Sequence, residues 1–288
     1  MLQSGWLSCL PWRRAALSAN WEKMLIDCHA HLALDCFDPD RDRVRDRARQ
    51  VGIAAVLVVG EGLEDNRRVE EVVRTAGEGA VVLLPCFGFH PDRFADDRPL
   101  PAREQIDATK VQIRDGASRL AAVGEVGLDY WCAKDHQRRG LQAALLEELA
   151  ELASELGLPL NVHSRSAGHY TIDLLRRVGA RRVLMHAFDG KVSHAVRAAE
   201  AGYFFSIPPS VVRSPQKQKL VRGLPLESVL LESDSPVLGP VKDARNEPAN
   251  VVHARDFIAG THCVPPEEVD EITTENARRL FPALSRVL

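Results

Sequence analysis

Eight short apolar runs recur along the chain from Met24 onward, and segments of helical length separate them. The runs are continuous in apolarity rather than alternating, which is typical of strands buried on both faces, as in a parallel sheet. We expect strands at residues 24–28, 53–59, 81–87, 120–126, 159–163, 182–187, 203–207 and 228–233.

The intervening segments have the length and composition of amphipathic helices. Several of them end at a glycine directly before the next apolar run, the usual C-terminal stop of a helix, as at Gly52, Gly179 and Gly202. Strands that alternate with helices in this way predict a single-domain (β/α)8 TIM barrel. An open doubly wound sheet is the alternative, but no G-x-G-x-x-G opens a helix. The expected helices lie at 40–51, 64–76, 103–118, 136–156, 167–178, 191–201, 214–222, 249–260 and 265–280.

Length and charge narrow the function classes. The 288 residues fit one large α/β domain, and the 45% hydrophobic content provides for a substantial core. Lys and Arg number 37 against 40 Asp and Glu, a net charge of −3. This near-balance argues against a wide basic groove for long duplexes, although it leaves room for a small site where metal ions meet a phosphate. We expect a monomer with no obligate protein partner.

Residues 1–23 differ in character from the remainder. They carry Arg13 and Arg14 but no acid before Glu22, and Pro11 interrupts their apolar part. We interpret them as an extension or alternative start, with the barrel domain over 24–288; a weak organelle-targeting segment is the alternative. The six cysteines include no C-x-x-C, which favours reduced thiols and a cytoplasmic or nuclear protein. No apolar run is long enough to span a membrane.

The chemistry-bearing residues follow the predicted strands. The first strand leads into D-x-H-x-H, and residues i and i+2 of a strand point to the same face, so two imidazoles leave it side by side. Further histidines and carboxylates follow the fourth, fifth, sixth and eighth strands. A TIM barrel gathers these strand ends at one rim. We therefore expect a metal site built from His29, His31, Glu125, His163, His186 and Asp234.

Six ligands exceed what one tetrahedral ion takes, and two ions about 3.5–4 Å apart would use them all. A carboxylate can bridge two cations, and Glu125 follows the middle strand of the set. We assign one ion to the His29–His31 pair with Glu125 and Asp234, and the other to Glu125 with His163 and His186. Glu125 and Asp234 are the candidate catalytic residues, with Asp234 orienting a metal-bound hydroxide. The ligands suit Zn²⁺ or Mn²⁺, and Mg²⁺ by availability.

Other polar residues at the same rim suit an anionic substrate. The guanidinium of Arg165 matches phosphate geometry, although a structural salt bridge at the rim is an equal alternative. His90, Ser164 and Asn246 are the other candidates for substrate contact. Glu232 shares a face with Asp234, and we interpret it as half of a structural ion pair. The second strand ends at Gly60-Glu61, where we expect no chemistry.

Taken together, the motifs resemble the TatD family of metal-dependent deoxyribonucleases over about residues 24–285, and most resemble an animal branch of that family. The resemblance implies a barrel, two divalent metals, hydrolysis of DNA from its 3′ end, and the same six ligands. The motifs are D-C-H-A-H (27–31), G-F-H-P (88–91), G-E-V-G-L-D-Y (124–130), N-V-H-S-R (161–165), H-A-F-D-G (186–190), E-S-D-S-P (232–236), R-N-E-P (245–248) and T-T-E-N-A (273–277).

The chain departs from the family pattern at one place, and two alternative functions remain to be distinguished. The helix after the fourth strand, which in the family usually reads Gln-xxx-Phe-xx-Gln, here has Gln142, Leu146 and Leu149, which we expect to be remote from the metals. The same dinuclear site would serve an amidohydrolase or an aminoacyl-tRNA deacylase. Amidohydrolases often bridge their metals with a carbamylated lysine at strand four, so Glu125 favours the phosphodiesterase. A non-catalytic barrel scaffold is the third alternative, but scaffolds usually lose ligands.

Overall fold

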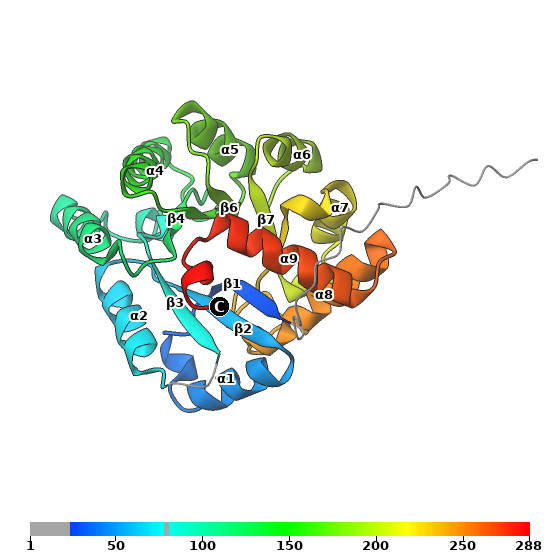
Figure 1. Ribbon diagram of the computed structural model, residues 1–288. Helices are drawn as coiled ribbons and strands as arrows, with labels where there is room; N and C mark the ends of the chain where they lie inside the picture. Colours follow the sequence, from blue (N-terminus) through cyan, green and yellow to red (C-terminus); the bar gives the residue numbers. More distant parts are fainter. Residues whose placement is uncertain (1–23, 78–80) are drawn as a thin grey trace, which may run out of the picture.

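A computed structural model describes residues 24–77 and 81–288, so the predicted extension 1–23 lies outside the described residues. Eight parallel strands follow one another around a barrel in sequence order, each hydrogen-bonded to the next, which confirms the predicted TIM barrel (Figure 1). The strands are β1 (Leu25–Ala30), β2 (Ile53–Val59), β3 (Val82–Phe87), β4 (Ala122–Gly127), β5 (Leu160–His163), β6 (Val183–Met185), β7 (Phe204–Ile207) and β8 (Val229–Leu231).

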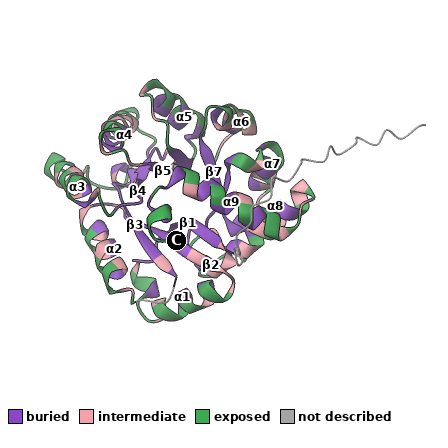
Figure 2. Cartoon of the chain, viewed as in Figure 1, coloured by how far each residue is buried: buried purple, intermediate pink, exposed green. Residues whose placement is uncertain are grey.

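Helices surround the strands with one face inward and one face in solvent (Figure 2). Each of the nine expected helical segments is present, with boundaries within two residues of those predicted, because the apolar stripes and glycine stops define them. The helices are α1 (Arg41–Gln50), α2 (Leu63–Thr75), α3 (Arg103–Gly116), α4 (His136–Leu156), α5 (Gly168–Arg177), α6 (Val192–Glu200), α7 (Pro215–Gly223), α8 (Val251–His262) and α9 (Pro266–Leu280).

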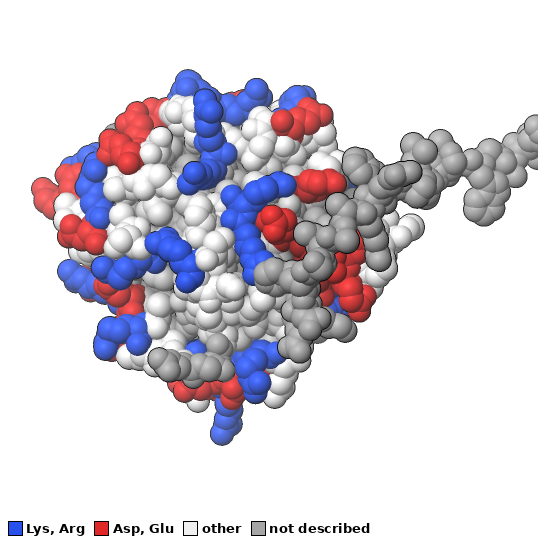
Figure 3. Space-filling model, viewed as in Figure 1, with Lys and Arg blue, Asp and Glu red and all other residues white. Residues whose placement is uncertain are grey.

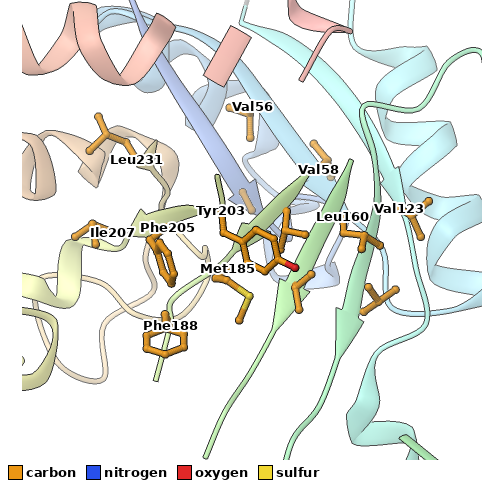
Figure 4. Close-up of a cluster of buried hydrophobic side chains, with 14 of the residues drawn as sticks. Val56, Val58, Val123, Leu160, Met185, Phe188, Tyr203, Phe205, Ile207 and Leu231 are labelled. Carbon is orange, nitrogen blue, oxygen red and sulfur yellow. The ribbon is translucent and has the colours of Figure 1, made fainter. Parts of the chain in front are cut away.

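Two hydrophobic layers hold the barrel together. Side chains alternate across each strand, so Ala55, Leu57 and Val59 of β2 belong to the cluster inside the barrel, whereas Val56 and Val58 pack outward against the helices. Figure 4 shows part of the outer layer, where side chains from six strands meet. Full burial of one such side chain contributes about 1.5–3 kcal/mol. These layers make the strand ends a rigid platform for polar side chains.

The C-terminal segment closes one end of the barrel. Helix α9 and the short 3-10 helix η6 (Leu284–Arg286) lie across the strands' N-terminal ends (Figure 1), and Phe281 and Leu284 join the interior cluster. Asn276 fastens α9 by donating from Nδ2 to the carbonyls of Leu226 and Val229. Acidic and basic side chains are interspersed over this face (Figure 3). Because α9 and η6 cover the N-terminal ends of the strands, the polar C-terminal ends gather at the opposite rim.

Two irregularities in strand pairing determine which side chains point into the barrel at that rim. Between Asp27 and Ala30, β1 advances three residues while β2 advances two, and between Val123 and Val126 β4 gains one residue over β5 in the same way. An extra residue of this kind changes which residues face inward. The histidines at the end of β1 and Glu125 of β4 consequently face the barrel axis, although each strand's earlier alternation would predict the other side.

Candidate metal centre

The end of β1 and the loop after β8 form one half of the centre. Nε2 of His29 and Nε2 of His31 lie 3.3 Å apart, as their i, i+2 spacing predicts. Each nitrogen is 3.4 Å from Oε2 of Glu125 and 3.6 Å from Oδ1 of Asp234. Two imidazole nitrogens and two carboxylate oxygens thus face one point.

The ends of β5 and β6 form the other half, around the second oxygen of the same carboxylate. Oε1 of Glu125 lies 2.8 Å from Nδ1 of His163 and 3.0 Å from Nε2 of His186. His90, after β3, places Nε2 3.2 Å from the same oxygen. The structure thus brings together all six predicted ligands, and it adds His90 to their immediate surroundings.

The nitrogens of two histidines that face away from the centre have fixed partners. Asn161 donates from Nδ2 to the carbonyl of Cys28, so its Oδ1 is the acceptor for Nδ1 of His29, at 2.8 Å. Asp129 Oδ2 lies 3.0 Å from Nε2 of His163. These contacts place a proton on the outer nitrogen of each ring and leave a lone pair on the inner one, the tautomer that a metal ligand needs.

Glu232 contacts the ring of His186 at Nδ1, the nitrogen that does not face Glu125. Its Oε2 lies 3.4 Å from Nδ1 of His186 and accepts from Oγ of Ser206 at 2.6 Å, while Oε1 accepts from the backbone N of Ala187 at 2.8 Å. The expected structural ion pair therefore exists, but its partner is a predicted metal ligand. Glu232 thus fixes both the ring of His186 and the backbone that follows it.

The electrostatics of the cluster favour ionised carboxylates at its centre. Burial alone would raise the pKa of Glu125, but the charges of His90, His186 and His29 outweigh it and hold this pKa well below its usual range. Burial alone would lower the pKa of His31, yet Asp234 and the neighbouring carboxylates raise it to about 9. The central carboxylates are thus ionised, and positive charge around them is favourable.

The donor set fits a divalent cation on each side of Glu125. Oε2 of Glu125 is buried and has no hydrogen-bond donor among the described residues. Oε1 lies 2.8 Å from Nδ1 of His163, and a ring that carries its proton on Nε2, towards Asp129, turns a lone pair towards Oε1. Such contacts are unfavourable without a shared positive charge. Imidazole with carboxylate is a set that Zn²⁺ and Mn²⁺ accept.

Hydrogen bonds to backbone groups connect the segment after β8 to β1 at the centre. Oδ1 of the buried Asp27 accepts from the backbone N of His29 at 3.2 Å and of Ser233 at 2.8 Å, and the backbone N of Asp234 donates to the carbonyl of His29 at 2.9 Å. Asp234 adopts a positive φ of 51°, which these contacts hold. A glycine is required at Gly88, where a Cβ would meet the carbonyl oxygen of Glu125 at 2.2 Å.

The predicted substrate contacts take different positions. Arg165 is exposed, and no carboxylate of the described ranges lies within ion-pair distance of it. Ser164 is buried, and its Oγ has no hydrogen-bond partner within the described chain. Asn246 is occupied structurally, because its Nδ2 donates to the carbonyls of Ser233 and Val237 at 2.6 and 2.8 Å.

Several supporting residues escaped the sequence-based prediction. Asn161 stands two residues before a ligand on the same strand, so strand alternation alone could have found it. Asp129 and Glu61 lie in loops, where no periodicity applies; Oε1 of Glu61 is 3.5 Å from Nδ1 of His31, although no chemistry was expected there. Gln142, expected to be remote, accepts from the backbone N of Asp129 at 3.0 Å.

Comparisons with known proteins give sequence matches over most of the chain. The family model "TatD related DNase" matches residues 26–282. The mouse protein "Putative deoxyribonuclease TATDN3" is 45% identical over 269 residues, covering 92% of this chain and 90% of its own length. The human "Deoxyribonuclease TATDN3" is 43% identical over 269 residues, covering 92% of this chain and 97% of its own length.

Solved structures share the same fold. A TatD homologue from Escherichia coli superposes with a TM-score of 0.80 at 24% identity, covering 90% of this chain and 98% of that one. A TatD family hydrolase from Entamoeba histolytica gives 0.79 at 19% identity, covering 89% and 97%. Among the described residues, no helix combines the length and apolarity needed to cross a membrane.

Proposed function

Because the chain belongs to the TatD-related DNase family, we propose that it hydrolyses phosphodiester bonds of DNA at a centre of two divalent cations bridged by Glu125. It is a metal-dependent hydrolase of that family. The observation that carries the proposal is the Glu125 carboxylate, whose two oxygens face two separate sets of imidazole nitrogens at 2.8–3.4 Å.

One cation would be held by His29, His31 and Asp234 with Glu125, and the other by His163 and His186 with Glu125. Nε2 of His90 lies 3.2 Å from Oε1 of Glu125, only slightly farther than His163 and His186, so His90 would border the second cation or contact the phosphate beside it. Zn²⁺, Mn²⁺ and Mg²⁺ are the candidates. When bound, such a pair neutralises charge on a phosphate and lowers the pKa of water towards 7.

The chain's own residues supply the remaining steps. The pKa of Asp234 is lowered because His31, His186 and His29 outweigh the effect of its burial, so Asp234 is ionised at neutral pH and accepts the proton of the attacking water. His90 and the exposed Arg165 would hold non-bridging oxygens of the phosphate. Glu125 keeps the two halves of the centre in register while charge shifts during in-line displacement.

The depth of the centre supports action at a chain end. Glu125 is 1% exposed, Asp234 5% and His31 8%, so a scissile phosphate must reach below the rim. The interior of a duplex cannot bend to reach so buried a centre, whereas a single-stranded end can enter it. We therefore propose exonucleolytic action, and the family resemblance favours removal of nucleotides from the 3′ end.

The test uses chelator-stripped protein reloaded with Zn²⁺, Mn²⁺ or Mg²⁺ and a 5′-labelled single-stranded oligonucleotide. We expect a ladder that shortens from the 3′ end with metal and no cleavage without it. Glu125→Gln should abolish the ladder, whereas Glu148→Gln, a matched change at a carboxylate that pairs with Arg103 and Lys110, should retain it. Cleavage of aminoacyl-tRNA or an amide substrate instead of DNA would replace this proposal with one of its alternatives.

We further propose that the enzyme acts as a monomer without an obligate partner, in the cytoplasm or nucleus. The cysteines of the described residues are all free thiols, as a reducing compartment requires; they are Cys28, Cys36, Cys86, Cys132 and Cys263. Light scattering of the purified protein tests the first point, and imaging of the tagged full chain tests the second. A stable dimer or a purely organellar signal would contradict them.

A further inference from the structure

We propose that an aromatic strip beside the metal centre stacks the unpaired bases of single-stranded DNA and so selects single-stranded ends as substrate. The strip consists of Trp131 and Tyr170, with Tyr130 between them and the cations of Arg165 and Lys134 upon it. This inference rests on the proposed function, because it names the form of DNA that the same centre would receive.

Two large aromatic side chains on different segments are each more than half exposed. Trp131, in the loop after β4, is 59% exposed, and Tyr170, at the start of α5, is 51% exposed. Tyr130 connects the two segments, because it precedes Trp131 in the chain and its ring lies 5.2 Å from that of Tyr170. Single exposed apolar residues are common on proteins. Neighbouring exposed rings accompanied by cations are the arrangement that single-strand binding proteins use for bases and phosphates.

Cationic side chains line the same rings. The guanidinium of Arg165 lies 5.0 Å from the centre of the Trp131 ring, and Nζ of Lys134 lies 5.1 Å from it. Arg139 lies 4.5 Å above the ring of Tyr130. Arg165 has no carboxylate partner within the described ranges, so its charge is available to a phosphate. Rings for bases and cations for phosphates thus alternate within one strip.

A single carboxylate ties the strip to the metal centre. Asp129 Oδ2 holds His163, while Oδ1 accepts from the backbone N of Trp131 at 2.8 Å and of Cys132 at 3.0 Å. Arg165 follows His163 by two residues, a span of at most about 7 Å in extended chain. The strip therefore begins at residues next to a predicted metal ligand, on the side where nucleotides beside the scissile phosphate would lie.

Unpaired DNA fits this strip better than other occupants do. Stacking needs bases with exposed faces, which a duplex conceals within its own stack. Each base stacked on an aromatic ring contributes about 1–3 kcal/mol. The phosphate spacing of a single strand also supplies the anions that Arg165 and Lys134 require. Loss of stacking should therefore weaken binding by roughly 5- to 150-fold.

The experiment compares two single-stranded substrates with free 3′ ends in metal-loaded protein. One is a thymidine oligonucleotide, and the other carries base-free spacers at the two positions next to the scissile phosphate. Wild-type protein should cleave the first with at least fivefold higher kcat/KM, the difference falling in KM. Trp131→Ala should bring the ratio close to one, and Trp131→Phe should restore most of it. Val111→Ala, at a similarly exposed side chain of α3, should keep the wild-type ratio.

A binding measurement gives an independent readout. Trp131 is the only tryptophan after Met24, so the fluorescence quenching that separates wild-type protein from Trp131→Phe reports this ring. A cleavage-resistant phosphorothioate oligonucleotide should quench it, and a blunt duplex of the same sequence should not. The backbone N–H that Asp129 accepts is kept in every variant, so the support of His163 is preserved.

The outcomes separate the two proposals. Equal cleavage of the two substrates by wild-type protein, or an unchanged ratio in Trp131→Ala, would overturn the aromatic strip while leaving DNA hydrolysis intact. Stronger quenching by the duplex would likewise overturn it. Failure of wild-type protein to cleave any DNA with any of the three metals would instead overturn the proposed function.

Discussion

Asp129→Asn tests how the metal centre depends on residues that do not face the cations. The carboxylate serves two sides, since Oδ2 lies 3.0 Å from Nε2 of His163 and Oδ1 accepts from the backbone N of Trp131 and Cys132. Asparagine has the same shape but one acceptor oxygen. If that oxygen stays with the backbone donors, the amide nitrogen faces His163, whose ring must move its proton to Nδ1. The inner lone pair is then lost.

The size of the effect follows from the electrostatics of the carboxylate. Burial alone would raise the pKa of Asp129, but the hydrogen bond and charge of His163 outweigh it and lower the pKa from 3.8 to about 2. That difference corresponds to roughly 2.5 kcal/mol at full strength. Part of the shift comes from the backbone hydrogen bonds of Trp131 and Cys132, which asparagine keeps, so the part lost with His163 is about 1–2 kcal/mol. We expect about tenfold weaker binding of the cation held by His163, within the range typical of such supporting residues.

Calorimetric titration of chelator-stripped protein with Mn²⁺ is the assay. Wild-type protein should show two binding steps, and Asp129→Asn should weaken one of them while leaving the other. The matched control is Asp135→Asn, because Asp135 also accepts from a backbone N, that of Arg138 at 3.0 Å, but at the start of α4. Wild-type affinity for both ions in Asp129→Asn would show that Asp129 does not support His163 as a ligand, as would an equal loss in the control.

Three further predictions concern pH, orientation and packing. Because the pKa of His31 is raised to about 9, its ring keeps a proton at neutral pH that a cation must displace. The apparent metal affinity should therefore rise up to about pH 9 and then level. A pH-independent affinity in calorimetry would contradict this. Asn161→Ala should weaken metal binding by about 10- to 100-fold because His29 loses its orienting acceptor; an unchanged chelator-competition curve would exclude that role. Phe205→Ala removes a buried ring that packs edge-on at 5.3 Å against Phe188; urea denaturation should show a loss of about 3–5 kcal/mol, and a loss under 1 kcal/mol would indicate a core that collapses around the gap.

Most of the fold could be predicted because its signals are local. Continuous apolar runs and the glycines that end helices can be recognised in the sequence itself, and they place each strand and helix within a few residues. The last strands are shorter than expected, because the histidine after β6 and the carboxylates after β8 lie outside the strand pairing and point into the rim. Register could not be predicted, because the extra residues in β1 and β4 appear only in the pairing with neighbouring strands.

The same distinction applies to the site. The six candidate ligands could be predicted because each follows a strand, and the barrel gathers strand ends. Residues that support them from loops, such as Asp129 and Glu61, depend on three-dimensional contacts that no spacing encodes. Gln142 is the clearest case, because a helix position expected to be remote bonds the backbone of Asp129.

Anomalous scattering from crystals grown with Zn²⁺ or Mn²⁺ would locate the cations directly. We expect two peaks about 3.5–4 Å apart, one between Oε2 of Glu125 and the His29–His31 pair and the other between Oε1 and His163 with His186. A single peak, or two peaks that do not share Glu125, would contradict this expectation.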